Sequence, residues 1–223
     1  MAATQNGPSF VDSVGLEEKR LAASVVSSMS ELALYDNLML LGSGIEACIQ
    51  KRLIQPALIL IYSGIDTAGW LGSDKPNASR TTFIDWVERY LLKAKPLACT
   101  AVDLYAARCG LLHTFTPDSK LSSEGEARRI CYAWGTATAE DLQRATASMN
   151  ATDRYVAVHV EGLYEGWRLG LRLFTEEIGK GAVRKSRVYA KADRFFSPLC
   201  INVVKDALGI LDKDAARDPG TEA

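Results

Sequence analysis

Histidine is scarce in this chain of 223 residues, because only His113 and His159 are present. This shortage argues against metal sites built on histidine clusters and against a mechanism in which one chain supplies two imidazoles. Glycine-rich phosphate loops of the patterns GxxxxGK(S/T) and GxGxxG are absent, and so is the GxSxG turn of α/β-hydrolases. We therefore expect neither a metal ion nor a cofactor, and no α/β-hydrolase chemistry.

The cysteines do not form a recognisable set of pairs. Their number is odd, they are widely spaced, and no CxxC sequence occurs. A disulfide framework or a cysteine-based zinc site would need paired or closely spaced cysteines. We therefore expect reduced thiols and a cytoplasmic protein. The five cysteines are Cys48, Cys99, Cys109, Cys131 and Cys200.

An excess of basic residues and a long hydrophobic run are also missing. The chain has 26 Lys and Arg against 27 Asp and Glu, so any binding of a polyanion must come from a local patch. Residues 1–14 lack the pattern of a signal peptide. The most apolar run, Ala57 to Leu71, is too short to span a bilayer and contains Asp66, so we expect a buried helix and no membrane contact.

Hydrophobic periodicity predicts one mainly helical domain over residues 16–211, between disordered ends at 1–15 and 212–223. A small insert at about residues 125–160 contains two strands with a helix between them. Gly42-Ser43-Gly44 is expected to break the first helix, and Trp134 and Trp167 are expected in the core. The expected helices cover 16–52, 57–71, 81–93, a stretch that Pro96 opens, 139–148, 161–178 and 184–199; the expected strands cover 129–134 and 154–160.

One short segment has residue types that suit chemistry on a phosphodiester. Arg108 is followed by four residues and then by His113, in a stretch whose apolar side is expected to contain Val102, Tyr105 and Leu112. Five positions along a helix change the direction of a side chain by about 140°. A long arginine and a histidine can still meet from those positions near a helix end.

This segment resembles the R-x4-6-H element of the HEPN superfamily, in which the motif lies on a late helix of a small helical bundle. The resemblance covers roughly residues 30–119 and implies a HEPN-like bundle with a small two-stranded insert and C-terminal helices. Many HEPN proteins are metal-independent endoribonucleases, whereas others bind nucleotides or RNA without catalysis. In the family an earlier helix carries an acidic residue, and the matching position here is Asp66.

Two features stand beside this resemblance. Arg154 and His159 fit the same spacing, but they lie in a run with strand-like alternation, where positions five apart point to opposite faces. The residue after the motif arginine is often polar in active members of the family, and here it is Cys109. The thiol could donate weakly, or it could simply pack.

The residue types suit RNA cleavage by attack of the 2′-hydroxyl on the adjacent phosphorus. Histidine changes protonation near neutral pH and can act as base or acid, while arginine stays charged and matches phosphate oxygens. One chain offers one credible imidazole, so the enzyme hypothesis requires a homodimer that brings two Arg108–His113 pairs together. Asp66 could orient either residue or be a solvated carboxylate, and Arg108 could instead pair with Asp103 or Asp118.

A second candidate surface is the basic helix near the C-terminus. Its cations alternate with aromatic residues, which could follow an RNA backbone while bases stack on the rings. The alternative is an amphipathic helix with a solvated polar face. The candidate RNA-binding residues are Arg184, Lys185, Arg187 and Lys191, with Tyr189, Phe195 and Phe196 as the rings.

Three hypotheses follow from the sequence. The first is a HEPN-like endoribonuclease of a toxin or defence system, with RNA as substrate and an antitoxin or regulatory protein as partner. In the second, the chain is a HEPN-like module that binds RNA, nucleotide or protein without catalysis. The third is an unrelated helical protein in which the Arg108–His113 spacing is a coincidence.

Overall fold

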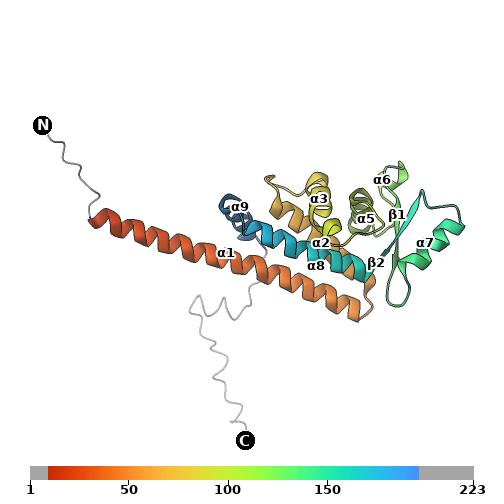
Figure 1. Cartoon of the computed structure of the whole chain (residues 1–223), viewed down its shortest axis with the longest axis horizontal. Helices are drawn as coiled ribbons and strands as arrows, with labels where there is room; N and C mark the ends of the chain where they lie inside the picture. Colours follow the sequence, from red (N-terminus) through yellow and green to blue (C-terminus); the bar gives the residue numbers. More distant parts are fainter. Residues whose placement is uncertain (1–9, 196–223) are drawn as a thin grey trace, which may run out of the picture. The chain divides into compact units, whose positions relative to one another are not determined.

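The computed structural model describes the backbone of residues 10–195 and the side chains of residues 30–195. The described chain is mainly helical and contains one small two-stranded sheet, as the sequence predicted (Figure 1). The elements, in chain order, are α1 (Phe10–Gln50), α2 (Ile54–Gly72), α3 (Arg80–Trp86), the π-helical turn η1 (Val87–Leu91), α4 (Leu92–Ala94), α5 (Ala101–Thr114), α6 (Lys120–Ser123), β1 (Arg129–Ala133), α7 (Ala139–Ser148), β2 (Tyr155–His159), α8 (Val160–Ile178) and α9 (Ala182–Ala192).

Helix α2 is the central element of the core and packs against α1, α3, α5, α8 and α9. The apolar run that predicted a buried helix forms this element, with Pro56 in its first turn. Burial of the run on several sides explains why its sequence is continuously apolar rather than amphipathic. Its fully buried residues include Ala57, Ile61, Tyr62, Ile65, Ala68 and Leu71.

Helix α1 runs without a break through Gly42 and Gly44, so the predicted split is wrong. At Gly42 an added Cβ would lie 3.7 Å from the hydroxyl of Tyr164 on α8. The same hydroxyl donates a hydrogen bond to Glu46 at 2.7 Å. Contacts with α8 at Gly42 and at Glu46 outweigh the low helix propensity of the glycines. The helix also begins at Phe10, within the segment expected to be disordered.

The apolar stripe at three-to-four spacing on α1 is not the buried face. Leu34, Leu38 and Ile45 are buried, whereas Leu32, Tyr35, Met39 and Leu40 are exposed. Within the described residues, Ser30–Gln50 is the one helical stretch long and apolar enough to cross a membrane by length and composition. These two properties do not separate a membrane span from a packed helix. In the structure, α1 packs against α2, α8 and α9.

The helix predicted over residues 81–93 is present, but it contains a π-helical turn. It starts at a capping box, in which the side chains of Ser79 and Thr82 bond to each other's backbone N–H groups. The stripe that predicted the helix is buried, from Phe83 to Tyr90. The extra residue in η1 changes the direction of the following side chains, and such turns occur often at functional sites.

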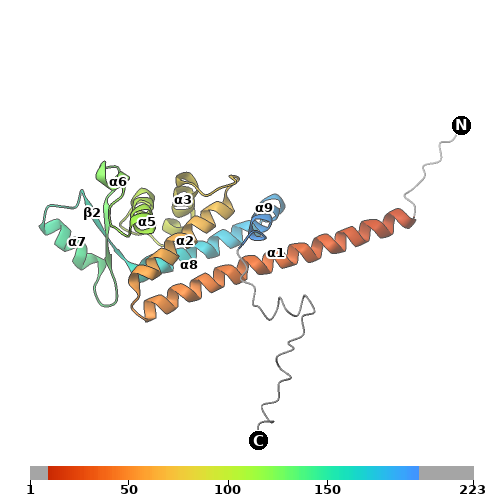
Figure 2. The same ribbon diagram turned by 180° about the vertical axis from the view of Figure 1, so that it is seen from behind.

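The insert is a β-α-β unit, as expected from its sequence. Strands β1 and β2 pair in parallel, from Arg129 opposite Tyr155 to Ala133 opposite His159, and α7 makes the crossover. Figures 1 and 2 both show the two strands between α5 and α7. A contact between the hydroxyls of Tyr62 and Tyr132 joins β1 to α2. Trp134 follows β1 and is 42% exposed, so its predicted place in the core is wrong.

The C-terminal helices differ in how well their ends were predicted. Helix α8 has nearly the expected bounds and buries Leu163, Trp167 and Phe174 as predicted. Helix α9 ends at Ala192, seven residues before the expected end at Leu199. The compact unit that contains all these elements ends at Asp193, and a second unit begins at Arg194. The expectations for residues 196–223 lie outside the described residues.

Candidate functional site

Helix α5 carries the Arg-His motif and has well-defined ends. Thr100 and Asp103 form a capping box at its start, so the helix begins at Ala101 and not at Pro96 as predicted. At its other end, Phe115 adopts a left-handed backbone with φ of 56°. Because a left-handed residue stops helical hydrogen bonding, His113 lies in the last turn of α5.

The buried face of α5 is formed mainly by small residues, and the predicted apolar side is wrong. Ala101, Leu104, Ala106 and Gly110 are buried, whereas Val102, Tyr105 and Leu112 are only half-buried. At Gly110, an added Cβ would lie 2.6 Å from two carbonyl oxygens of the turn after the helix. Close packing of backbone against this face explains why hydrophobic periodicity did not identify it.

The guanidinium of Arg108 lies between Asp66 of α2 and His113. Its Nε donates a hydrogen bond to Asp66 Oδ2 at 2.7 Å, and its Nη1 lies 3.1 Å from Nε2 of His113. The side chains of Arg108 and Asp66 are 20% and 16% exposed, while His113 is exposed. Because a guanidinium only donates, Nε2 is the acceptor, and the imidazole in this contact carries no proton on Nε2.

Burial shifts the ionisation of both members of the Asp66–Arg108 pair. It raises the pKa of Asp66, although the hydrogen bond and charge of Arg108 oppose that shift. Burial also acts against the charge of Arg108, but Asp66 outweighs it and the pKa of the guanidinium is raised. Arg108 is therefore a permanent cation, and it makes the ionised form of Asp66 less costly.

The carboxylates suggested as other partners of Arg108 have different partners. Asp103 is buried and pairs with Arg128 at 2.7 Å, while Asp118 pairs with Arg129. Arg128 and Arg129 enter β1, so both ion pairs connect α5 and its C-terminal turn to the insert. Of the three carboxylates considered for Arg108 in the sequence, the structure selects Asp66.

Cys109 is half-buried and lies beside the phenol of Tyr105. Burial is the main cause that raises the pKa of Tyr105, and its hydrogen bond with Cys109 adds to it. The Tyr105 ring also packs edge-on against Phe83, with 5.5 Å between ring centroids. Cys109 therefore follows the motif arginine in sequence, and its thiol interacts with both the hydroxyl of Tyr105 and the guanidinium of Arg108.

The second Arg-His match is not brought together in the same way. His159 ends β2, and its Nδ1 lies 3.0 Å from Glu161 Oε2. The guanidinium of Arg154 lies over the ring of Tyr155, 5.9 Å from its centroid. The strand predicted for this run is present, and the two side chains contact different partners.

The predicted basic surface on α9 is mostly used within the fold. Lys191 is only 9% exposed, and its Nζ donates to the carbonyl oxygens of Trp70, Ser73 and Lys75 at 2.6 to 2.9 Å. These carbonyls belong to the C-terminal end of α2 and the loop after it, where a cation is favourable. Lys191 thus caps α2, which gives it a different role from the predicted RNA contact.

The other three cations of α9 do not form one row. Arg184 pairs with Glu177 and donates to the hydroxyl of Tyr90 at 2.6 Å. Lys185 lies 3.5 Å from Glu31 of α1, and Arg187 is exposed. Among the rings expected to stack on bases, Tyr189 is buried and Phe196 lies outside the described residues. This arrangement fits the amphipathic-helix alternative better than an RNA-binding surface.

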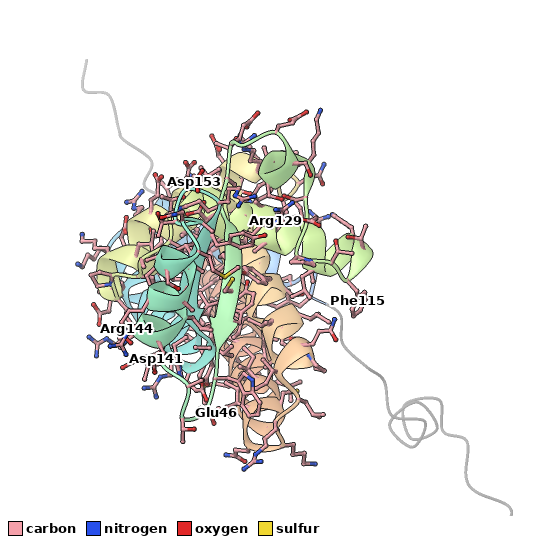
Figure 3. All side chains as sticks on the ribbon, turned by 90° about the vertical axis from the view of Figure 1, so that its right-hand side faces the viewer. Glu46, Phe115, Arg129, Asp141, Arg144 and Asp153 are labelled. Atoms are coloured by element: carbon pink, nitrogen blue, oxygen red, sulfur yellow. The ribbon has the colours of Figure 1, made fainter. Side chains whose placement is uncertain are left out.

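Two cavities lie elsewhere. One of about 400 Å³ lies between α1 and α8, and one of about 130 Å³ lies beside α2, α3 and α9. Neither is lined by Arg108 or His113, and of this pair only His113 is exposed. Phe115, which follows the motif, is 63% exposed and lies at the edge of the molecule in Figure 3. Within residues 30–195, no group of three or more His, Cys, Asp and Glu side chains is placed to hold a metal ion.

Comparison with known proteins adds no relative. No family model matches the sequence, and no significant similarity is found to a curated protein or to a solved structure. The geometry of the side chains around Arg108 is therefore the basis for assigning a function.

Proposed function

We propose that this chain is a HEPN-like endoribonuclease that cleaves RNA by attack of the 2′-hydroxyl, without a metal ion in the reaction. The observation that supports this most is the contact of Arg108 with both Asp66 and His113 at the surface. Cleavage requires a cation for the phosphodiester and an unprotonated imidazole nitrogen for its neighbouring hydroxyl, and here the two groups lie side by side. The exposed position of His113 suits an extended polymer.

In the proposed mechanism, Asp66 positions Arg108 and does not touch the substrate. A guanidinium has more N–H donors than its contacts with Asp66 and His113 use, so donors remain for phosphate oxygens. In the free protein, Nη1 of Arg108 donates a hydrogen bond to Nε2 of His113. When a phosphate draws the guanidinium away, Nε2 becomes available to accept the proton of the 2′-hydroxyl.

The leaving 5′-oxygen needs a proton, and a second copy of the chain would supply it. The sequence has only one other histidine, and it belongs to the contact with Glu161 described above. A two-fold axis beside the C-terminal end of α5 would place two Arg108–His113 pairs in one groove. The exposed ring of Phe115 next to the motif provides apolar surface for such a contact.

The test is cleavage of a labelled single-stranded RNA in the presence of EDTA. Wild type should produce fragments that end in a 2′,3′-cyclic phosphate, and His113→Ala should abolish them. Arg108→Lys should retain the charge but lose the bond to Asp66, and its rate should fall by at least about tenfold. The matched control is His159→Ala, which should cleave like wild type.

The result that rejects the enzyme proposal is equal behaviour of wild type and His113→Ala, whether both cleave or neither does. The dimer is tested separately by light scattering after size exclusion. Heterodimers of Arg108→Ala and His113→Ala chains should regain part of the activity if each copy contributes a group to one groove.

The alternative is a HEPN-like module that binds RNA without cleaving it. The residue after the motif arginine favours this alternative, because Cys109 takes the place of the polar residue that active family members often have. Retained RNA binding by wild type, without cleavage, would support this second function.

A further inference from the structure

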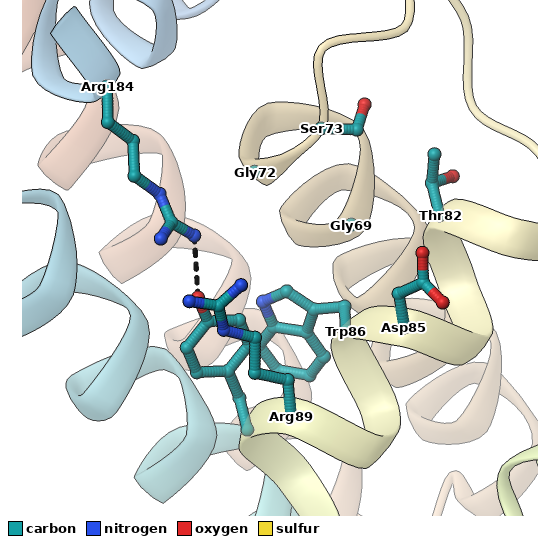
Figure 4. Close-up of a pocket in the computed structure, with 9 residues that line it drawn as sticks. Gly69, Gly72, Ser73, Thr82, Asp85, Trp86, Arg89 and Arg184 are labelled. Atoms are coloured by element: carbon teal, nitrogen blue, oxygen red, sulfur yellow. Dashed lines mark hydrogen bonds between the residues drawn. The ribbon is translucent and has the colours of Figure 1, made fainter.

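A cavity of about 130 Å³ lies beside the C-terminal end of α2, between α3, η1 and α9 (Figure 4). Gly69 of α2, Trp86 of α3, Arg89 and Tyr90 of η1 and Arg184 of α9 contribute to its wall. The volume is well above the roughly 30 Å³ that one water molecule takes up in the liquid. The cavity can therefore hold a group of several heavy atoms.

Two N–H donors on this wall have no acceptor among the described residues. They are Nε1 of Trp86 and Nε of Arg184. Trp86 is only 2% exposed. A buried donor without an acceptor costs about 1–3 kcal/mol, so most such groups in folded proteins are satisfied. Figure 4 shows the Trp86 indole nitrogen and the Arg184 guanidinium facing the same space from α3 and α9.

The carboxylate that pairs with Arg184 already has several partners. Glu177 of α8 contacts both Arg89 and Arg184 and accepts a hydrogen bond from Tyr90 at 2.7 Å. The two free donors therefore require another acceptor, and they lie next to a cluster of arginines. This combination of a planar cation with directed N–H groups is typical of oxyanion recognition.

The charges around the cavity leave an excess of positive charge. Arg89 and Arg184 are on its wall, and the ammonium of Lys191 donates to the carbonyl oxygen of Ser73, a wall residue directly after α2. Against these three cations stand two carboxylates, Glu177 and the exposed Asp85 at the rim. The balance is one positive charge, which an anion with one or two negative charges can compensate.

We propose that this cavity binds a small tetrahedral oxyanion, namely phosphate, either free or as the terminal group of a small organic phosphate. The ligand would accept hydrogen bonds from Trp86 Nε1 and Arg184 Nε and would contact the guanidinium of Arg89 at the more exposed side. This site is separate from Arg108 and His113 and does not depend on ribonuclease activity.

The experiment measures phosphate binding to the full chain by ³¹P NMR line broadening and by the shift in melting temperature. Sodium phosphate is compared with sodium chloride at equal ionic strength and pH. A ligand that binds only the folded state raises the melting temperature as its concentration exceeds its Kd. Adenosine monophosphate is titrated in parallel, and tighter binding than that of free phosphate would identify an organic phosphate as the ligand.

The decisive variant is Trp86→Phe, which removes the indole N–H and keeps an aromatic ring in the core. It should weaken phosphate binding by about tenfold or more, the effect expected from one hydrogen bond to a charged group. Trp134→Phe is the matched control, because that indole is exposed and away from the cavity, and it should bind like wild type. Arg89→Gln tests the site from its exposed side, should Trp86→Phe fail to fold.

The proposal is overturned if neither phosphate nor adenosine monophosphate gives a broadening or a shift beyond that of chloride. Binding that is equal in wild type, Trp86→Phe and Arg89→Gln would overturn it as well, because the ligand would then lie elsewhere. Loss of binding in these variants with RNA cleavage retained would support the phosphate site independently of the proposed nuclease.

Discussion

Asp103 connects the start of the motif helix to the insert, and its removal should weaken the whole fold. Its side chain is 4% exposed. The carboxylate accepts from the backbone N–H of Thr100 at 2.9 Å and from the backbone N–H of Arg128 at 2.7 Å. The Arg128 guanidinium donates to it as well, at 2.7 Å. Asp103→Ala therefore leaves a cation and two backbone donors without their acceptor.

The magnitude follows from the burial of this pair. Removing one partner of a fully buried ion pair costs about 3–5 kcal/mol. Arg128 is 30% exposed and stays partly hydrated, so we expect about 2–4 kcal/mol here, much of it from the two backbone donors that lose their acceptor. In a chain of this size, 1 kcal/mol corresponds to a change in Tm of about 2–4 °C. We therefore expect Asp103→Ala to lower the Tm by about 10 °C, measured by circular dichroism.

Asp118→Asn is the control for this measurement. Asp118 also pairs with an arginine at the start of β1, but its side chain is 53% exposed. Solvent weakens such a pair, so this variant should melt close to wild type. If Asp103→Ala melted within about 2 °C of wild type, our account of the buried pair would be refuted, since the estimated energy predicts a larger change.

The same pair predicts a dependence of stability on pH. Burial alone would raise the pKa of Asp103, but hydrogen bonds from Thr100 and Arg128 outweigh it and the pKa is lowered. A lowered pKa stabilises the fold above the unfolded value of about 4, and this contribution is lost as the pH falls through the folded value. The difference in unfolding free energy between wild type and Asp103→Asn should therefore shrink below about pH 4.

Four further predictions concern other positions. Asp66→Ala should lower the rate of RNA cleavage by about tenfold or more, because Arg108 loses the hydrogen-bond acceptor that positions it. Asp66→Asn should retain more activity, because an amide oxygen can still accept from Nε of Arg108. Single-turnover kinetics compare the two variants. Gly110→Ala should destabilise the protein by about 1–3 kcal/mol in urea unfolding, because of the two carbonyl oxygens 2.6 Å from its Cβ. Gly44→Ala should instead stabilise it by up to about 1 kcal/mol, since that Cβ would lie 3.5 Å from its nearest neighbour in a helix. Burial raises the pKa of Cys99 to about 12, so in native protein at pH 8 this thiol should resist iodoacetamide in a mass-spectrometric assay and react only after unfolding.

Local patterns in the sequence predicted most elements of the fold. Residues 139–148 form a helix with the expected bounds, and the two strands start and end within one residue of prediction. The misses came from tertiary contacts that override local preference. Gly42 looked like a helix break, but contact with α8 keeps it helical. Trp134 looked like a core residue, but it follows the end of β1 and remains exposed.

The candidate site was predictable only in part. Spacing placed Arg108 and His113 on one helix, and their contact agrees with a position near the helix end. That Asp66 contacts Arg108 depends on the packing of α2 against α5, which spacing cannot give. The spacing of the cations in α9 suggested an RNA-binding surface, whereas Lys191 caps α2. Spacing does not separate these roles, because a lysine that caps another helix and a lysine that faces solvent can occupy the same helical positions. The sequence did not indicate a binding role for Trp86 or Arg89, since Trp86 was interpreted as part of the apolar stripe that predicted the helix.

The capping of α2 by Lys191 has a consequence for biosynthesis. The carbonyl oxygens that this ammonium binds precede it by 116 to 121 residues. During translation, which proceeds at about 5–20 residues per second, the end of the central helix lacks its cation for many seconds. The nascent chain would therefore acquire its final stability late, and truncated products ending before residue 191 should be selectively vulnerable to cellular proteases.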